Sequence, residues 1–377
     1  MSVDAPPSTL TFTASREAVA SVLQVVGRAV SSRSSVQILG GILLRTTEDS
    51  VEAAATDMEL ALRAKIDAAV AGPGSVVVPG RVLLDIVRVL PPGEVTFAQV
   101  AGESTVSITC GSASYRVHTY DATDFPELPS AGGDETFTLP REPFLETLAT
   151  VGKAASKDES RPVLTGILIR LSGDKLVMAA TDSYRLSVKE TKIDLSEGIE
   201  LDAVVPARAM NEVARLGAAA DDAPIEVAVH QNQILFGCGG VWLSARRIDG
   251  QFPNYDQLKP DSFDAEMRAP RDELADVVRR VAVLAQRNTA LRLGLTEGEL
   301  SLRSQTQDVG EAHETMPVAF TGEPIEIGFN PAFFLEGLES ISTDEVVLRL
   351  INPLRPGLLS DGSEDFWYLI MPIRLAS

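Results

Sequence analysis

The chain has 377 residues, of which 45% are hydrophobic and 23% charged, the balance of a globular protein and not of a disordered one. Its 33 Lys and Arg stand against 53 Asp and Glu, and the net charge of −20 excludes a generally basic nucleic-acid coat and disfavours a membrane-surface role. The 2 cysteines, Cys110 and Cys238, are too few for a disulfide scaffold or a cysteine-based zinc site.

The N-terminal segment MSVDAPPSTL has neither the basic nor the apolar part of a secretory signal. No long uninterrupted apolar run follows it, so we expect a cytoplasmic protein that does not enter membranes. The first helix is predicted within residues 14–33, because Val19, Leu23, Val26 and Val30 recur there at the spacing of one buried helix face.

Strands and helices alternate along the rest of the chain. Stretches in which every second residue is apolar predict strands from Leu60 to Ile66, from Val106 to Cys110 and from Ile225 to Val229. Apolar residues at helical spacing, with breakers before them, predict further helices within residues 79–91, 140–157, 205–217, 270–287 and 330–341.

The C-terminal segment Phe366–Leu375 is strongly apolar. Its first part is predicted to be a final strand that completes a core. Pro372 argues against a central strand at that point, because proline cannot donate to a sheet ladder. An apolar tail that a sheet does not fully bury could form one wall of a groove for a partner's peptide.

Four short segments of the first third of the chain recur 125 to 127 residues later. The recurrences pair Leu39–Leu43 with Leu164–Leu168, Ala55–Asp57 with Ala180–Asp182, Val78–Arg81 with Val205–Arg208, and Phe125–Leu128 with Phe252–Tyr255. A fainter third copy places Leu295–Leu300 124 residues after Leu171–Leu176. Because this period far exceeds the roughly 20–50 residues of solenoid repeats, each copy is expected to be a domain with its own core.

Each copy contains two predicted helices and two groups of predicted strands. We therefore predict an α+β fold of three similar domains per chain, each with two helices packed on antiparallel sheets. The copies meet in segments rich in small, polar or turn-forming residues, which places the domains at residues 1–131, 132–260 and 261–377.

Charge is divided unequally between the predicted helices and the rest of the chain. The six helix windows hold 14 Lys and Arg against 10 Asp and Glu, a net charge of +4, which leaves −24 for the remainder. One interpretation is that arginine, a good helix former, covers solvated helix faces. The other is that the helices line a surface that meets phosphates, through contacts that are independent of base sequence and sensitive to salt.

Signatures of catalysis are scarce. The chain has no phosphate-binding G-x-x-x-x-G-K-[ST] loop, no H-E-x-x-H zinc helix and no G-x-S-x-G elbow. Its 3 histidines lie in separate copies and not at metal-binding spacing. The two cysteines lie on apolar strands and are expected to be buried, and Asp57 and Asp182 are expected to accept backbone hydrogen bonds in Thr-Asp turns. The sequence thus predicts no catalytic residue, no metal site and no cofactor.

Several segments match a known family, namely Gln37–Gly40, Ala180–Leu186, Val204–Pro206, Asp249–Tyr255 and Met371–Leu375. On these segments the sequence resembles the bacterial sliding clamps, the beta subunits of DNA polymerase III, along essentially its whole length. The resemblance implies a head-to-tail homodimer that closes a six-domain ring around duplex DNA, with helices lining the hole. It implies a processivity factor and not an enzyme, which tethers the replicative polymerase, the clamp loader and repair proteins through short linear peptides.

The resemblance also implies site residues. Contacts to DNA phosphates would come from arginines in and near the helices: Arg33, Arg81, Arg88, Arg161, Arg208 and Arg215. A groove between the second and third domains would bind peptides that carry glutamine and bulky hydrophobic residues, through Leu164, Thr181, Tyr184, Arg185, Leu186, Pro253, Leu258, Phe333, Leu354, Met371, Pro372, Ile373 and Arg374. At the dimer interface, Tyr115 of one chain would face Val283 and Leu284 of the other.

Two other functions remain open from the residues alone. A scaffold that binds only proteins would use the C-terminal groove and never meet DNA. A carboxylate-dependent hydrolase is the other alternative, but no pair of carboxylates has a spacing that favours it.

Overall fold

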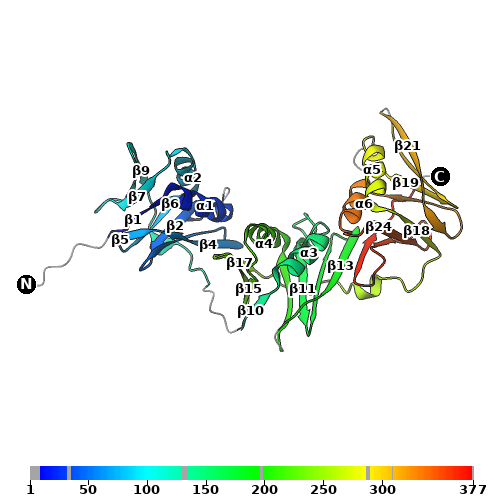
Figure 1. The fold of residues 1–377 in the computed structure, drawn as a ribbon, viewed down its shortest axis with the longest axis horizontal. Coiled ribbons are helices and arrows are strands. Elements are labelled where there is room, and N and C mark those ends of the chain that lie inside the picture. Colours follow the sequence, from blue (N-terminus) through cyan, green and yellow to red (C-terminus); the bar gives the residue numbers. More distant parts are fainter. Residues whose placement is uncertain are drawn as a thin grey trace, which may run out of the picture. The chain divides into compact units, whose positions relative to one another are not determined.

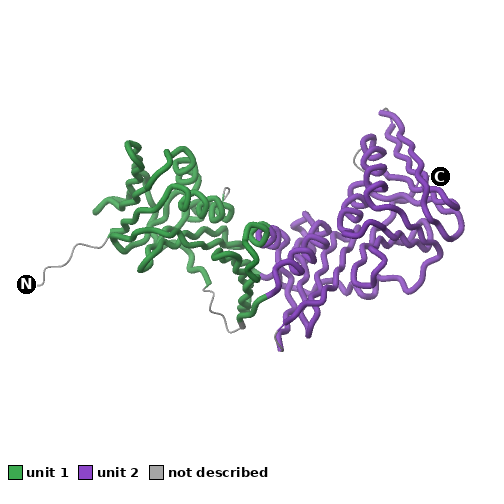
Figure 2. Tube along the Cα trace, viewed as in Figure 1, with its two compact units in different colours: residues 1–138, 215–246 green, residues 139–214, 247–377 purple. Residues whose placement is uncertain are grey.

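The computed structural model describes residues 9–31, 35–129, 135–195, 198–285, 289–307 and 309–375. The chain forms two compact units, one of residues 1–138 with 215–246 and one of residues 139–214 with 247–377 (Figure 2). Figure 1 labels many of the helices and strands of each unit. From β15 (Ile225–Val229) onward in the eight-stranded sheet, and throughout the other three sheets, adjacent strands are antiparallel.

The first unit holds two sheets and the helices α1 (Arg16–Val26) and α2 (Gly80–Val89), which pack against each other. Its five-stranded sheet has the order β5 (Ala69–Gly72), β1 (Thr11–Ser15), β7 (Glu94–Gln99), β8 (Thr105–Cys110), β9 (Ala113–His118). Its eight-stranded sheet has the order β10 (Glu135–Leu139), β15 (Ile225–Val229), β16 (Gln233–Cys238), β17 (Val241–Arg246), β4 (Leu60–Asp67), β3 (Ser50–Thr56), β2 (Gly41–Thr46), β6 (Ser75–Pro79).

The second unit also holds two sheets, together with α3 (Arg141–Gly152), α5 (Arg271–Ala282) and α6 (Pro331–Leu338). Its nine-stranded sheet has the order β14 (Glu200–Pro206), β11 (Gly166–Ser172), β12 (Lys175–Thr181), β13 (Arg185–Lys192), β26 (Phe366–Ile370), β25 (Gly357–Ser360), β24 (Glu345–Leu350), β18 (Ala265–Pro270), β22 (Ala319–Thr321). Its four-stranded sheet has the order β21 (Gly310–Pro317), β20 (Glu299–Thr306), β19 (Leu291–Thr296), β23 (Ile325–Phe329). Helix α4 (Ala207–Ala219) has residues in both units.

The six predicted helices are all present in the described ranges and are shorter than their windows, except that α4 extends beyond its window to Ala219. In α1 the predicted apolar face is buried at Val19, Leu23 and Val26, and the Ser15 hydroxyl caps the helix by accepting from the Ala18 N–H at 3.1 Å. The three predicted strands are β4, β8 and β15. Each third of the chain contains a strand, a helix, four strands, a second helix and three strands in that order, and the described residues of the first and third add one short strand, β5 or β22. This shared order confirms three similar α+β domains per chain.

Sheets pass from one copy of the repeat into the next through matching strand pairs. In the first unit β4 pairs with β17 so that Leu62 lies opposite Leu243. In the second unit β13 pairs with β26 so that Ser187 lies opposite Tyr368. Ser187 is 125 residues after Leu62, and Tyr368 is 125 residues after Leu243. The register of the two junctions is therefore the same.

Both cysteines are buried, as predicted, and burial raises the pKa of the Cys238 thiol to about 11. The described part of the chain contains no helix that is both long and apolar enough to cross a lipid bilayer.

Candidate functional site

The Thr-Asp turn between β12 and β13 is closed by its own side chains. The Thr181 hydroxyl donates to the Arg185 carbonyl at 2.6 Å and accepts from the Ser183 N–H at 3.2 Å. The Asp182 carboxylate accepts from the N–H groups of Tyr184 and Arg185 at 2.9 and 3.0 Å. Ser183 takes a φ of 77°, which directs Tyr184 outward with 62% of its surface exposed.

The first copy of the repeat builds the same turn between β3 and β4. There the Thr56 hydroxyl donates to the Leu60 carbonyl at 3.0 Å, Asp57 accepts from the N–H groups of Glu59 and Leu60, and Met58 has a φ of 78°. The predicted role of Asp57 and Asp182 as backbone acceptors is confirmed. Because the two turns have different side chains at their tips, they differ in what they present to solvent.

The C-terminal tail lies directly beside the second of these turns. Strand β26 is fully buried between β13 and β25 and ends before Pro372, as the sequence predicted. The Met371 N–H then donates to the Tyr184 carbonyl at 2.8 Å, and the Ile373 N–H donates to the Gly328 carbonyl at 2.7 Å. The Met371 side chain remains 45% exposed next to the Tyr184 turn.

The other predicted groove residues lie at several depths in the second unit. Leu164, Thr181 and Leu186 are buried, Phe333, Pro372 and Ile373 are half-buried, and Pro253, Leu258, Leu354 and Arg374 are exposed. Leu354 and Arg374 line one open hollow of about 400 Å³, together with Arg292, Glu326 and Leu375. The structure therefore brings together two pairs of the predicted groove residues, Tyr184 with Met371 and Leu354 with Arg374. Among the described contacts, none connects Pro253 or Leu258 to either pair.

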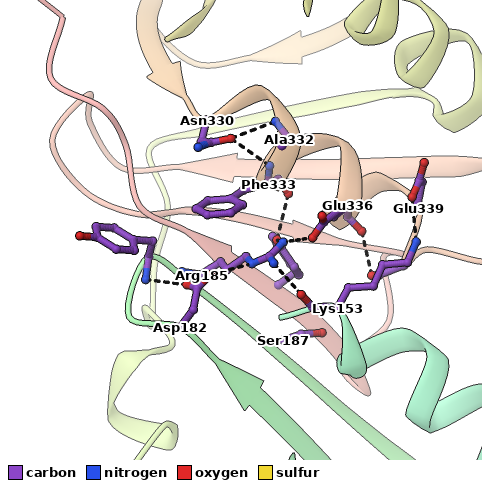
Figure 3. Close-up of polar contacts among 12 residues, drawn as sticks. Lys153, Asp182, Arg185, Ser187, Asn330, Ala332, Phe333, Glu336 and Glu339 are labelled. Carbon is purple, nitrogen blue, oxygen red and sulfur yellow. Dashed lines mark hydrogen bonds and ion pairs between the residues drawn. The ribbon is translucent and has the colours of Figure 1, made fainter. Parts of the chain in front are cut away.

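Arg185 is buried, unlike the exposed members of this set, with a side chain only 6% exposed. Figure 3 shows its polar contacts. Its Nε donates to Asp182 at 3.0 Å, Nη1 donates to Glu336 and to the Tyr368 hydroxyl, and Nη2 donates to the Lys153 carbonyl at 2.5 Å. Burial works against the charged guanidinium, but the bonds and charges of Tyr368 and Glu336 outweigh it and raise the pKa of Arg185.

Phe333 completes the surroundings of Arg185. Its ring lies 4.3 Å from the guanidinium carbon, and its carbonyl accepts from the Tyr368 hydroxyl at 2.9 Å. Helix α6 approaches β26 closely because Gly337 has no side chain: a Cβ there would lie 2.8 Å from the Tyr368 ring. The sequence did not identify Lys153, Glu336 or Tyr368, and no local signal joins them, because they lie far from Arg185 in the chain.

The arginines predicted to meet DNA form a repeated pattern. Arg81 and Arg88 are exposed and seven residues apart on α2, and Arg208 and Arg215 are exposed at the matching positions of α4. A seven-residue separation puts two side chains on one helix face, roughly 10 Å apart. Arg161 is exposed in the loop after α3, where it donates to the Ser183 hydroxyl at 2.8 Å and lies 3.6 Å from Asp158. Arg33 lies outside the described residues.

The residues predicted for the dimer interface lie on or near the outer strands of two sheets. Tyr115 is half-buried on β9, the last strand of its sheet. Val283 is 80% exposed just after α5, and the Leu284 carbonyl accepts from the Thr306 hydroxyl near β21, the outer strand of another sheet. Val309, between β20 and β21, is 53% exposed and adds to this apolar surface.

In the ranges that the structure describes, no group of three or more His, Cys, Asp or Glu side chains is arranged to hold a metal ion.

Comparison with known proteins gives a consistent result over the whole length. Three family models of the DNA polymerase III beta subunit match in order: the N-terminal domain at residues 10–129, the central domain at 138–254 and the C-terminal domain at 256–374. The beta sliding clamp of Synechococcus elongatus is 35% identical over 94% of this chain and 96% of its own.

Solved structures agree with the sequence comparisons. The sliding clamp of Bacillus subtilis is 25% identical and superposes with a TM-score of 0.93 over 98% of this chain and 100% of its own. A sliding clamp of Pseudomonas aeruginosa bound to griselimycin is 27% identical, with a TM-score of 0.90 over 97% of this chain and 100% of its own.

Proposed function

The chain belongs to the family of DNA polymerase III beta subunits, the bacterial sliding clamps, and from that premise we propose how its residues assemble a ring, meet DNA and bind partners. The protein is a DNA polymerase processivity clamp of three domains. Its role is non-catalytic: enclosing DNA keeps a bound polymerase at high effective concentration near its template.

The ring is proposed from the repeated junctions between domains. Strands β4 and β13 occupy equivalent places in the first two copies, and each pairs with the last strand of the following copy, β17 or β26. The strand equivalent to β4 in the third copy is β21, and the strand equivalent to β17 in the first copy is β9. Both are outer strands of their sheets in the described structure. Pairing β21 of one chain with β9 of the next continues the pattern, and two chains close it.

The same equivalence gives the register of this pairing. When the pairing seen at the two internal junctions is transferred to the equivalent residues of β9 and β21, Tyr115 lies opposite the partner's Ala312. Arg116 then lies opposite the partner's Glu311. Leu284 contacts the same strand, since a Cβ on Gly310 would lie 3.7 Å from it, and this supports the predicted packing of Tyr115 on Val283 and Leu284. An oppositely charged pair directly across the junction favours this register.

Backbone geometry supports this register independently. The Thr119 N–H donates to the Ser104 carbonyl, so alternation along β9 turns the N–H and C=O of Ser114 and Arg116 to the free edge. The Val318 N–H donates to the Gly298 carbonyl, which by the same alternation turns Glu311 and His313 outward on β21. The proposed register pairs outward residues with outward residues.

DNA is proposed to pass beside the helices. Arg81, Arg88, Arg208 and Arg215 supply cationic side chains at repeated positions, and a chain of net charge −20 repels phosphates elsewhere. Contacts of this kind are independent of base sequence and weak, so they allow sliding.

Replacing these four arginines by alanine is expected to leave the ring and its peptide binding intact and to weaken binding to duplex DNA. The two-chain ring loses eight arginines, four from each chain, so the slope of log K against log salt is expected to become less steep by up to about 7, at about 0.9 for each lost phosphate contact. The measurement is binding of a short duplex at several salt concentrations, with Arg45→Ala and Arg63→Ala as charge controls on sheet positions. An unchanged slope and unchanged polymerase stimulation would instead support the scaffold that binds only proteins.

Peptide partners are proposed to bind the exposed apolar surface around Tyr184, Met371, Leu258 and Leu354. The equivalent junction in the first unit has different side chains: Glu59 stands at the position of Tyr184, Ala61 at Leu186 and Arg246 at Met371. It encloses a hollow of only about 60 Å³. A hydrophobic peptide would bury less apolar surface at this junction than around Tyr184, so it would bind more weakly there.

We therefore expect one peptide site per chain and two per ring. Titration calorimetry, or native mass spectrometry of the ring with a labelled peptide, reads this number directly. A measured value of two peptides per chain would show that the first junction also binds.

Enclosure of DNA requires a closed ring. The observation that carries it is the identical register of the two internal junctions, which leaves β9 and β21 to close the ring. The test is retention on DNA. Clamp loaded on a nicked circular plasmid is expected to remain bound and to be lost within seconds to minutes after linearisation, because it slides off the ends. Equal loss from both forms would rule out enclosure.

A further inference from the structure

We propose that Arg185 is a positioning residue that fastens helix α6 of the third domain to the Thr-Asp turn of the second, and that it shapes the peptide groove without contacting the peptide. The inference rests on the proposed peptide-binding function of this surface. It assigns Arg185, together with its partners Glu336 and Tyr368, the task of holding the groove walls in place (Figure 3).

The first observation is that the guanidinium is already occupied. Its nitrogens donate to a carboxylate on each side, from Asp182 and Glu336, and to the Lys153 carbonyl at the end of α3. Its face is covered by the Phe333 ring at 4.3 Å, and 6% of the side chain is exposed. A peptide lying on the surface would meet Tyr184 and Met371, which are 62% and 45% exposed, before it met Arg185.

The second observation comes from the internal repeat, which provides a control within the same chain. At the position of Arg185 the first copy has Leu60, yet its turn has the same side-chain hydrogen bonds and the same positive φ at Met58. The backbone bond from Met371 to Tyr184 also has its counterpart, from the Arg246 N–H to the Glu59 carbonyl at 3.0 Å. Neither the turn nor the strand junction therefore requires an arginine.

The contacts specific to Arg185 are those to α6 and β26 of the third domain. Glu336 and Phe333 lie on one face of α6, and the Arg185 guanidinium contacts both of them. On β26, the Tyr368 hydroxyl accepts from Arg185 and donates to the Phe333 carbonyl, so it connects β26 to α6. A second bridge joins the same two domains, because Lys153 at the end of α3 contacts Glu339 at the end of α6 at 2.7 Å. This network spans the two domains that the groove lies between.

The residues that form the exposed walls of the groove are bonded to members of this network or to each other. Asp182, which binds Arg185 through one oxygen, holds the Tyr184 N–H with the other. Tyr184 holds Met371 through its carbonyl, and Phe333 stacks on the guanidinium. Removing the cation leaves two carboxylates facing each other in a mostly buried site, and their repulsion would push α6 away from the turn.

The test uses full-length variants and a fluorescein-labelled peptide that carries glutamine and bulky hydrophobic residues. Arg185→Leu, which introduces the residue of the first copy, is expected to weaken peptide binding about 30-fold. Glu336→Gln keeps the size of the side chain, lies outside the candidate groove set and is expected to weaken binding about 5-fold. Both variants are expected to speed amide hydrogen exchange in residues 332–338. Tyr184→Ala is expected to weaken binding about 10-fold without changing that exchange.

Several results would overturn the inference. If Arg185→Leu weakened binding while exchange in α6 stayed unchanged and Glu336→Gln bound like the unaltered clamp, Arg185 would act by touching the peptide. If Arg185→Leu bound normally, it would have no role in the groove. If Tyr184→Ala and Met371→Ala also bound normally, the proposed peptide site itself would be wrong. Should Arg185→Leu fail to fold, Glu336→Gln alone still decides, through its affinity and its exchange.

Discussion

Arg116→Pro is expected to turn the two-chain ring into single chains. The proposed register turns the Arg116 N–H toward the partner's Glu311, where proline cannot donate and its ring blocks the approach. Within its own sheet β9 does not use this N–H, so the domain keeps its fold. The cost is about 3 kcal/mol at each interface. A ring has two identical interfaces, so its dissociation constant should rise about four orders of magnitude. Light scattering would show half the mass of the unaltered ring.

Charge reversal tests the register without proline. Arg116→Glu places two glutamates opposite each other, and Glu311→Arg in the same chain restores an oppositely charged pair, so the single variant should dissociate and the double variant recover. Arg116→Ala keeps the N–H and should remain a ring, because it removes only an exposed ion pair, and exposed ion pairs contribute little. A monomeric double variant would show that these residues are not opposite each other. A dimeric Arg116→Pro would exclude β9 as the joining strand.

The repeat made most of the fold predictable from the sequence. Short landmarks such as the Thr-Asp turns recur because each closes a hairpin with its own side chains, a local requirement that leaves a local signature. Helix faces were readable for the same reason, since Val19, Leu23 and Val26 are buried together on α1. Helix ends were less predictable: the window 270–287 exceeds α5, which ends at Ala282, because a few apolar residues after the last turn continue the pattern without being helical.

The candidate site was only partly predictable. Exposed residues such as Tyr184 and Met371 belong to segments with a recognisable pattern, but the Arg185 network joins residues 153, 336 and 368, and no spacing along the chain relates them. The sequence also gave no indication that Arg185 is buried while Tyr184, its neighbour, is exposed. That difference follows from the positive φ of Ser183 and from the stacking of Phe333 on the guanidinium, both consequences of folding.

A chain that ends at Ile370 is expected to lose peptide binding and to keep its ring. The truncation removes Met371, whose exposed side chain lies beside Tyr184, and it removes Ile373 and Leu375, which fix the tail against Gly328. Losing one complete wall of a hydrophobic groove removes several apolar contacts, each worth about 1.5–3 kcal/mol when fully buried, so affinity should fall more than about 100-fold. Fluorescence anisotropy with the labelled peptide measures this, and polymerase stimulation should fall with it.

The ring should survive the truncation because β26 ends at Ile370 and keeps its pairing with both β13 and β25. The proposed joining strands, β9 and β21, lose no residue. Met371→Ala is the matched control: it keeps the backbone bond to Tyr184 and removes only the side chain, so affinity should fall about 10-fold. If the truncated chain were monomeric or unfolded while Met371→Ala bound peptide normally, the tail would serve folding. The peptide groove would then have to be sought among Leu258, Leu354 and the hollow that Arg374 lines.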